Sequence, residues 1–245
     1  MRISRLYIDT PLAANQTITI KGEPLNYLAN VLRLKTGATL SVFNGQGGEF
    51  TATISELSKR EATLSLGDFQ NNDSESSLEI TLIQGISRGE RMDFTLQKAT
   101  ELGVNRIIPV FTERCTVNLK GERLEKRLKH WQGTVRSACE QSGRNTLPII
   151  ETAQDFNSLI PTSHPQNGHH YLLLDPESNH SLTSLTQPSS VTLLIGPEGG
   201  FSERERELAY TNHYQGIQLG PRVLRTETAA ITAISAAQVL WGDLH

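Results

Sequence analysis

The feature that most constrains the fold is a series of short apolar runs in the second two-thirds of the chain. Each run is almost unbroken by polar residues, and helical patterns or loops separate the runs from one another. The runs lie at 78–84, 106–110, 171–174, 191–195 and 217–219. Strands that are apolar on both faces belong in a parallel sheet covered by helices on both sides. We therefore expect an α/β domain built on a parallel sheet.

Apolar residues at helical spacing lie between these runs. Met92, Leu96, Ala99 and Leu102 recur in this way before Gly103, which marks the end of a helix. A longer helix is predicted over 124–138, and a final one over 226–240 with Thr226 as its N-cap. The charged stretch that follows Gly200 also has helical character.

The first 70 residues follow a different pattern, with apolar and polar residues alternating as in strands that have one buried face. Four such segments lie at 17–20, 39–43, 50–54 and 62–66. One helix is expected from Pro24 to Leu32, because proline favours the first turn and Gly37 follows its end. These short strands predict a small β-barrel over 1–72, and the polar stretch 70–77 is expected to link it to a second domain over 73–245.

Composition excludes several classes of protein. Hydrophobic residues make up 37% of the 245 and charged residues 20%, as in a soluble globular chain, and no apolar run approaches the ~20 residues that span a bilayer. Since the N-terminus has no apolar run that resembles a signal peptide, we expect a cytoplasmic protein. Cys115 and Cys139 are too few for a metal cluster and are expected to be unpaired thiols.

The charge distribution points to a local basic face. The net charge is −3, but residues 84–149 carry 12 basic and 7 acidic side chains, whereas residues 150–245 carry 4 and 10. A basic segment can attract a polyanion even on an acidic protein. The alternative is a solvated helix surface, because residues 122–129 read as a helix with salt bridges one turn apart.

The common nucleotide and metal motifs are missing. The stretch GQGGEF at 45–50 lacks the last glycine of a dinucleotide-binding loop, and no phosphate-binding GxxxxGK[ST] sequence occurs. The chain also lacks HExxH and paired CxxC motifs. We read His169 and His170 as part of a loop after Asn167-Gly168, so no metal is expected.

Three of the predicted strands end in glycine- and proline-containing loops. These are 174–177, 196–200 and 219–225. In a parallel sheet, ligands bind beyond the carboxyl ends of the strands. Glycine permits close approach of the backbone and proline stiffens the loop, so three such loops can hold a planar, uncharged group through main-chain atoms. Tight turns without a ligand are the alternative.

Four segments together resemble the RsmE family, the bacterial 16S ribosomal RNA (uracil-N3)-methyltransferases of the SPOUT superfamily. They are RGERMDFTLQKATELG at 88–103, ACEQSGR at 138–144, LLIGPEGGFS at 193–202 and LGPRVLRTETAA at 219–230. NVLRL at 30–34 resembles the family's N-terminal barrel helix, although Tyr27 stands near the place where the family often has histidine. The similarity therefore covers nearly the whole chain.

The resemblance implies a fold, a cofactor and partners. It implies a PUA-like, RNA-binding β-barrel over 1–72, and a SPOUT α/β domain with a C-terminal trefoil knot over 73–245 that binds the cofactor and dimerises. It further implies S-adenosylmethionine as methyl donor, small-subunit ribosomal RNA or a ribosomal particle as substrate, and a homodimer. Candidate dimer contacts on the final helix are Ile231, Ile234 and Val239.

The resemblance also assigns candidate site residues. The cofactor contacts would be Leu174, Gly196, Gly200, Leu219, Gly220 and Leu224. Arg225 and Glu198 would be catalytic. On this reading Arg225 stabilises the anion that forms when uracil N3 loses its proton, and Glu198 orients Arg225 or touches the base. Glu227 is expected to be structural, because a helix N-terminus favours its ionised form and makes it a weak base. A water molecule or a phosphate could accept the proton instead.

Phosphate contacts are expected from basic residues in both domains. The candidates are Arg2, Arg5, Arg33, Lys35, Arg88, Arg91, Arg114 and Arg144. Two other functions remain open from the residues alone. One is a related enzyme that methylates another base or a ribose 2′-hydroxyl, and the other is an RNA-binding assembly protein without activity.

Overall fold

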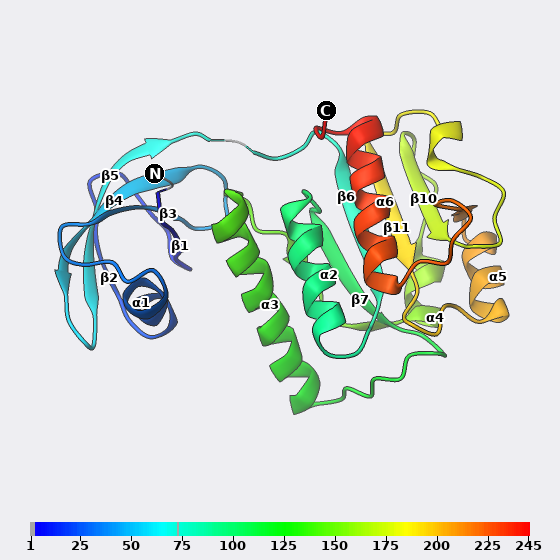
Figure 1. Cartoon of the computed structure of the whole chain (residues 1–245), viewed down its shortest axis with the longest axis horizontal. Helices are drawn as coiled ribbons and strands as arrows, with labels where there is room; N and C mark the ends of the chain where they lie inside the picture. Colours follow the sequence, from blue (N-terminus) through cyan, green and yellow to red (C-terminus); the bar gives the residue numbers. More distant parts are fainter. Residues whose placement is uncertain (1–2, 73) are drawn as a thin grey trace. The chain divides into compact units, whose positions relative to one another are not determined.

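The computed structural model describes residues 3–72 and 74–245. The chain forms two compact units (Figure 1). One comprises the residues up to 75 together with 139–147, and the other comprises 76–138 and 148–245. Residues 139–147 thus group with the N-terminal unit, which the sequence did not indicate, because the Arg5 guanidinium donates to the carbonyl of Arg144 and to the side chain of Asn145.

The first unit is built on a curled five-stranded sheet with the order β1-β3-β4-β5-β2. The strands are β1 (Arg5–Tyr7), β2 (Thr17–Ile20), β3 (Thr39–Phe43), β4 (Glu49–Leu57) and β5 (Ala62–Gln70). β1 pairs with β3 in parallel and the other pairs are antiparallel. All four strands predicted here are confirmed, whereas β1 is too short to show an alternating pattern.

The helix expected from Pro24 to Leu32 is present, but only its first part is α-helical. α1 (Glu23–Asn26) carries proline in its first turn, and Tyr27–Val31 continue it as a π-helix. Leu28 lies at the centre of the apolar core of this unit together with Leu6, Leu40 and Leu64. The helix therefore closes one side of the core that the strands leave open.

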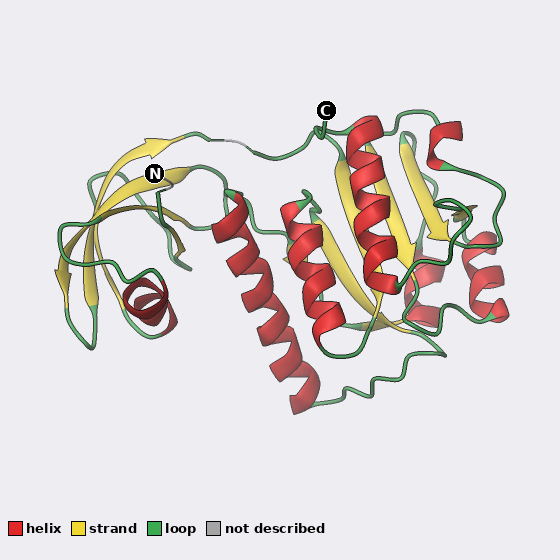
Figure 2. Cartoon of the chain, in the orientation of Figure 1, coloured by secondary structure: helices red, strands yellow, loops and turns green. Residues whose placement is uncertain are grey.

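The second unit contains a parallel seven-stranded sheet (Figure 2). Its main path is β12-β10-β11-β6-β7-β8, and β9 also pairs with β7. The strands are β6 (Glu79–Gly85), β7 (Arg106–Phe111), β8 (Ile149–Ile150), β9 (Gln154–Asp155), β10 (His169–Leu174), β11 (Ser190–Ile195) and β12 (Gln215–Ile217). The five longer runs predicted as strands are confirmed, although β12 lies two residues earlier than expected.

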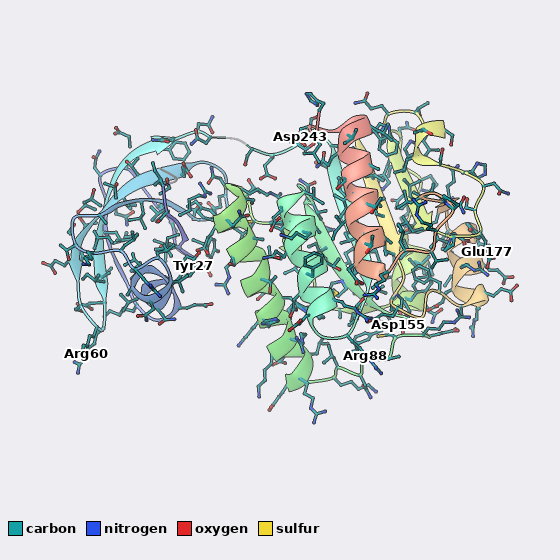
Figure 3. All side chains as sticks on the ribbon, in the orientation of Figure 1. Tyr27, Arg60, Arg88, Asp155, Glu177 and Asp243 are labelled. Carbon is teal, nitrogen blue, oxygen red and sulfur yellow. The ribbon has the colours of Figure 1, made fainter. Side chains whose placement is uncertain are left out.

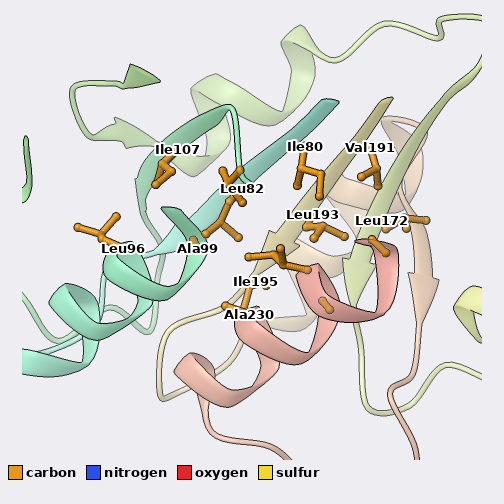
Figure 4. Packing of buried hydrophobic residues seen from close by; sticks show 14 of the residues in the cluster. Ile80, Leu82, Leu96, Ala99, Ile107, Leu172, Val191, Leu193, Ile195 and Ala230 are labelled. Carbon is orange, nitrogen blue, oxygen red and sulfur yellow. The ribbon is translucent and has the colours of Figure 1, made fainter. Parts of the chain in front are cut away.

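Helices cover both faces of this sheet, as nearly continuous apolar strands require. On one face, Leu172 and Leu193 lie in one core with side chains of α2 (Glu90–Glu101), α3 (Glu122–Ser142) and α6 (Thr226–Trp241). Figure 4 shows the part of this core that α2 and α6 cover. On the other, Leu173 and Leu194 pack against α4 (Phe156–Leu159) and α5 (Glu203–Thr211). Neighbouring leucines in a strand thus enter different cores, and the predicted α/β architecture is confirmed.

Two local predictions are wrong. His169 and His170 do not form a loop but are the first two residues of β10. The His169 ring is held by two hydroxyl groups of the adjacent strand, with Nδ1 at 2.6 Å from Ser190 Oγ and Nε2 at 2.9 Å from Thr192 Oγ1. Thr226 is not the N-cap of the last helix. Arg225 occupies that position without a side-chain cap, and the Thr226 hydroxyl bonds to a different segment.

The last helix is largely an interior element. Ile234, expected on an exposed dimer face, is fully buried in the core of the second unit, whereas Val239 is 59% exposed and Ile231 is half-buried. Among residues 3–72 and 74–245, no helix combines the length and the apolar character needed to cross a lipid bilayer.

Candidate functional site

A pocket of about 740 Å³ lies at the carboxyl ends of β10, β11 and β12. Because these strands are neighbours in the sheet, the loops that follow them meet at one edge. The pocket is lined by residues of 174–177, 195–203 and 217–226, with Arg91, Arg114 and Ala229 beside them. The structure thus brings together the three loops singled out in the sequence, and Glu177 lies on the pocket's exposed rim (Figure 3).

All eight residues proposed for cofactor binding and catalysis line this pocket. They are Leu174, Gly196, Glu198, Gly200, Leu219, Gly220, Leu224 and Arg225. The pocket combines apolar side chains from the strand ends with the main chain of 196–200, which we call the glycine loop. This combination suits an uncharged ring system held by backbone atoms.

The glycine loop is folded too tightly for larger residues. A Cβ atom on Gly196 would lie 3.2 Å from the backbone of Gly200, and Gly200 itself has φ of +66°. Pro197 packs against Gly85 at the end of β6, where a Cβ atom would come within 2.5 Å of the proline ring. The glycines and the proline therefore fix a compact loop against the end of the sheet.

Glu198 anchors this loop to the start of α2. Its Oε1 atom accepts a hydrogen bond from the Arg88 backbone N–H at 3.0 Å and forms an ion pair with Arg91 at 3.0 Å. Burial raises the pKa of Glu198, but hydrogen bonds from the Arg88 and Glu198 backbone and from Arg91 outweigh this, so its pKa lies below the ordinary value. A carboxylate stabilised in this way is a weak base. Among the described residues it forms no hydrogen bond or ion pair with Arg225, and its partners are the Arg88 backbone and the Arg91 guanidinium.

Arg225, unlike Glu198, is not held by other side chains of the described residues. It is exposed at the N-cap of α6, and its guanidinium forms no hydrogen bond or ion pair with any residue in the described ranges. Arg222 lines the same pocket and is equally exposed and unpaired within that part of the chain. Two arginines are therefore free to bind an anionic group at the pocket. Sequence reasoning missed Arg222, although it lies in the same motif as Arg225.

Glu227 lies outside the lining of the main pocket. It contributes instead to a second hollow of about 460 Å³ between α2, α3 and α6, together with Asp93 and the exposed Phe94. Its Oε2 atom is buried and has no hydrogen-bond partner among the described residues. This position agrees with the expectation that Glu227 does not act on a ligand of the main pocket.

A hydrogen-bonded cluster that the sequence did not reveal forms the far wall of the pocket. Asp175, directly after β10, is buried and accepts hydrogen bonds from the Tyr210 hydroxyl at 2.5 Å and the Glu177 backbone at 2.9 Å. Arg206 forms ion pairs with Glu177 at 2.6 Å and Asp175 at 3.5 Å. Burial, followed by the bond to Asp175, raises the pKa of Tyr210 to about 12. The only sequence signal for this cluster was an acidic residue directly after a strand.

The proposed phosphate contacts differ in their exposure and in their partners. Arg33, Lys35, Arg88 and Arg114 are exposed, although Arg114 also donates to the Gly199 carbonyl at 3.1 Å. Arg91 is engaged by Glu198. Arg2 lies outside the described residues.

Arg5 and Arg144 were also proposed as phosphate contacts, but in this structure their guanidinium groups bind residues of the first unit instead. Arg5 pairs with Glu49, donates to Asn145 Oδ1 at 2.7 Å and lies over the Phe43 ring. Arg144 pairs with Glu75, and its side chain is only 4% exposed. Both guanidinium groups therefore stabilise the first unit through partners within it.

Tyr27, whose role the sequence left open, is also engaged inside the first unit (Figure 3). Burial raises the pKa of its hydroxyl, and so does the hydrogen bond to the Glu140 carboxylate, which also accepts from the Tyr7 backbone at 2.9 Å. In the part of the chain that the structure describes, no group of three or more histidine, cysteine, aspartate or glutamate side chains could hold a metal ion.

Comparisons with known proteins identify the family of the chain. Residues 74–238 match the model of the RNA methyltransferase domain, and residues 20–67 match that of the RNA methyltransferase PUA domain. Ribosomal RNA small subunit methyltransferase E of Buchnera aphidicola subsp. Schizaphis graminum is 37% identical over 244 residues, which cover 99% of this chain and 98% of that protein.

Two solved structures resemble the whole chain. A putative methyltransferase from Legionella pneumophila, in complex with bound S-adenosylmethionine, superimposes with a TM-score of 0.95 at 38% identity. Ribosomal RNA small subunit methyltransferase E from Neisseria gonorrhoeae, bound to the same cofactor, gives a TM-score of 0.92 at 39% identity. Each match covers 100% of both chains.

Proposed function

Because this chain belongs to the ribosomal RNA small subunit methyltransferase E family, we propose that it methylates N3 of a specific uridine in 16S ribosomal RNA, with S-adenosylmethionine as donor. The observation that carries the proposal is the pocket at the ends of β10, β11 and β12. It unites the loops in which the family motifs lie, and its lining includes Arg222 and Arg225, which have no partner within the described part of the chain.

The pocket fits the cofactor in size and chemistry. A volume of about 740 Å³ lies within the range of small-molecule sites. Ile195, Ile217, Leu219 and Leu224 offer apolar contacts for an adenine ring, and the glycine loop offers backbone donors and acceptors. Arg206 and Glu177 provide charged groups on the far wall for the polar end of the molecule.

S-adenosylmethionine supplies a methyl group already activated on a sulfonium, so the protein mainly orients the reactants and adjusts the acceptor. Uracil N3 must lose its proton before it can attack. Arg225, which has no partner among the residues that the structure describes, stabilises the resulting negative charge on the uracil oxygens. Its planar guanidinium can donate to two acceptors at once. We assign the proton to solvent, because Glu198 is a weak base and already holds the loop.

We further propose that the C-terminal part of the second unit is tied in a trefoil knot and that two copies form a dimer. The family resemblance supports both statements. Val239 and Leu240 at the end of α6, and Phe94 on α2, are the large apolar side chains exposed on these helices that a second copy would cover. A ribosomal RNA substrate also supports a cytoplasmic location.

The proposal is tested by methyl transfer to defined RNAs. Purified protein is incubated with labelled S-adenosylmethionine and either 16S ribosomal RNA, assembled small subunits or bulk transfer RNA, all from cells that lack the enzyme. We expect incorporation into the small subunit or its RNA and none into transfer RNA. Transfer to transfer RNA alone, or no transfer despite cofactor binding in a calorimeter, would refute the proposal.

A further inference from the structure

One buried hydroxyl group joins the first turn of α6 to the glycine loop. Thr226 Oγ1 donates to the carbonyl oxygen of Gly196 at 2.6 Å, and Gln84 Nε2 donates to Thr226 Oγ1 at 2.9 Å. Gln84 is fully buried and Thr226 is 6% exposed. The ends of β6 and β11 and the start of α6, which are distant in sequence, are therefore connected through this hydroxyl.

Gln84 sets the direction of the hydrogen bonds. Its amide nitrogen donates to the Gly85 carbonyl at 3.1 Å as well as to Thr226. The reversed amide would place its oxygen against that carbonyl, so two acceptors would face each other. An amide nitrogen cannot accept a hydrogen bond. The single hydroxyl proton of Thr226 is therefore directed at Gly196.

The side-chain oxygen of Gln84 lowers the stability of the fold. Gln84 Oε1 is buried and accepts no hydrogen bond from a described residue, and an unpaired buried acceptor is unfavourable. Methionine has a similar volume and would fill the site without that cost. An amide kept in an apolar core despite its cost, and aimed at one hydroxyl, points to a role other than stability.

We propose that Thr226 is a positioning residue that holds Arg225 at a fixed place relative to the glycine loop, with Gln84 orienting its hydroxyl. Thr226 follows Arg225 directly, and both residues line the pocket. Since the Arg225 side chain has no hydrogen-bond or ion-pair partner among residues 3–72 and 74–245, the backbone of this turn determines where the guanidinium can reach. The inference rests on the proposed function, because it assigns the effect of Thr226 on catalysis to Arg225.

The kinetic test uses Thr226→Val, which keeps the shape and removes the hydroxyl, and Thr226→Ser, which keeps the hydroxyl. The matched control is Thr100→Val, because Thr100 is also buried and its hydroxyl donates to a backbone carbonyl, that of Leu96, inside α2. We expect Thr226→Val to lower the single-turnover rate about 10-fold, the effect of about 1.4 kcal/mol, because the hydrogen bond that ties this turn to Gly196 is lost. The serine variant and the control should keep at least about a third of the rate.

A double-mutant cycle separates positioning from general damage. If Thr226 acts through Arg225, then Thr226→Val should change the rate less than about 2-fold in an Arg225→Ala background. An equal 10-fold loss in both backgrounds would overturn the inference. Affinity for S-adenosylmethionine, measured by calorimetry, should fall much less than the rate in Thr226→Val, since valine keeps the shape of the side chain at this position of the pocket wall. A loss of affinity that matches the loss of rate would also overturn it.

A second readout does not require activity. Hydrogen exchange followed by mass spectrometry should show faster exchange in Thr226→Val at both 196–200 and 225–229, whereas Thr100→Val should change neither segment. Unchanged exchange at both segments would overturn the link. If the wild-type protein methylates no RNA, the proposed function fails, and the exchange data still decide whether the hydroxyl joins the two segments.

Discussion

Replacing Arg225 with alanine should separate catalysis from both folding and cofactor binding. The guanidinium is exposed and makes no hydrogen bond or ion pair among the described residues, and Arg225 occupies the N-cap of α6 without a side-chain cap. Its removal should therefore change the free energy of unfolding by less than about 0.5 kcal/mol. If the guanidinium stabilises the uracil anion, the turnover should fall by roughly 10²–10³, as when one preorganised donor is removed.

The assay is single-turnover methylation with saturating cofactor, together with calorimetric measurement of S-adenosylmethionine affinity for each variant at one salt concentration. Arg225→Lys should recover part of the rate, because it keeps the charge but loses the planar pair of donors. Arg204→Ala is the matched control, since Arg204 is an exposed arginine of α5 that does not line the pocket. If Arg225→Ala loses cofactor affinity in proportion to its rate, Arg225 belongs to the cofactor site and the catalytic assignment is refuted.

Three further outcomes follow from the structure. The pKa of Glu198 is lower in the folded protein than its ordinary value, so the stabilisation that Glu198 gives to the glycine loop should be present above the ordinary glutamate pKa and lost as the pH falls through the folded value. Cofactor affinity should therefore fall over that pH range, and Glu198→Gln should abolish this dependence. A pH dependence that persists in Glu198→Gln would contradict this explanation. Gly200→Val should weaken cofactor binding in calorimetry while RNA binding in a filter assay is kept, since valine is strained at a φ of +66°. Arg144→Ala should lower the thermal midpoint of unfolding because it removes the buried ion pair with Glu75. RNA affinity should still fall steeply with salt in this variant, since other arginines and lysines would make the phosphate contacts.

Local patterns predicted most of the architecture, because each depends on neighbouring residues. Apolar runs such as 191–195 identified the parallel strands, and glycine and proline at their ends identified the pocket loops. Contacts between distant segments could not be predicted. Thr226 has the residue type of an N-cap, but its hydroxyl bonds to Gly196, 30 residues away.

The same limit applies to charged side chains. Arg144 looks like a surface cation in the sequence, and only the fold shows that Glu75 neutralises it in a buried position. The partner of Glu198 could not be identified either, because Arg91 lies 107 residues earlier. The residue types at the site were therefore predictable, whereas their pairing depends on which loops the sheet brings together.

The most direct test of the central claim is the identity of the methylated nucleoside in 16S ribosomal RNA. RNA treated with the wild-type protein and S-adenosylmethionine is digested to nucleosides, and the products are compared with authentic standards by chromatography and mass spectrometry. The account predicts 3-methyluridine at a single site, and a strongly reduced amount with Arg225→Ala. A methyl group on a ribose 2′-oxygen, or on any base atom other than uracil N3, would contradict it.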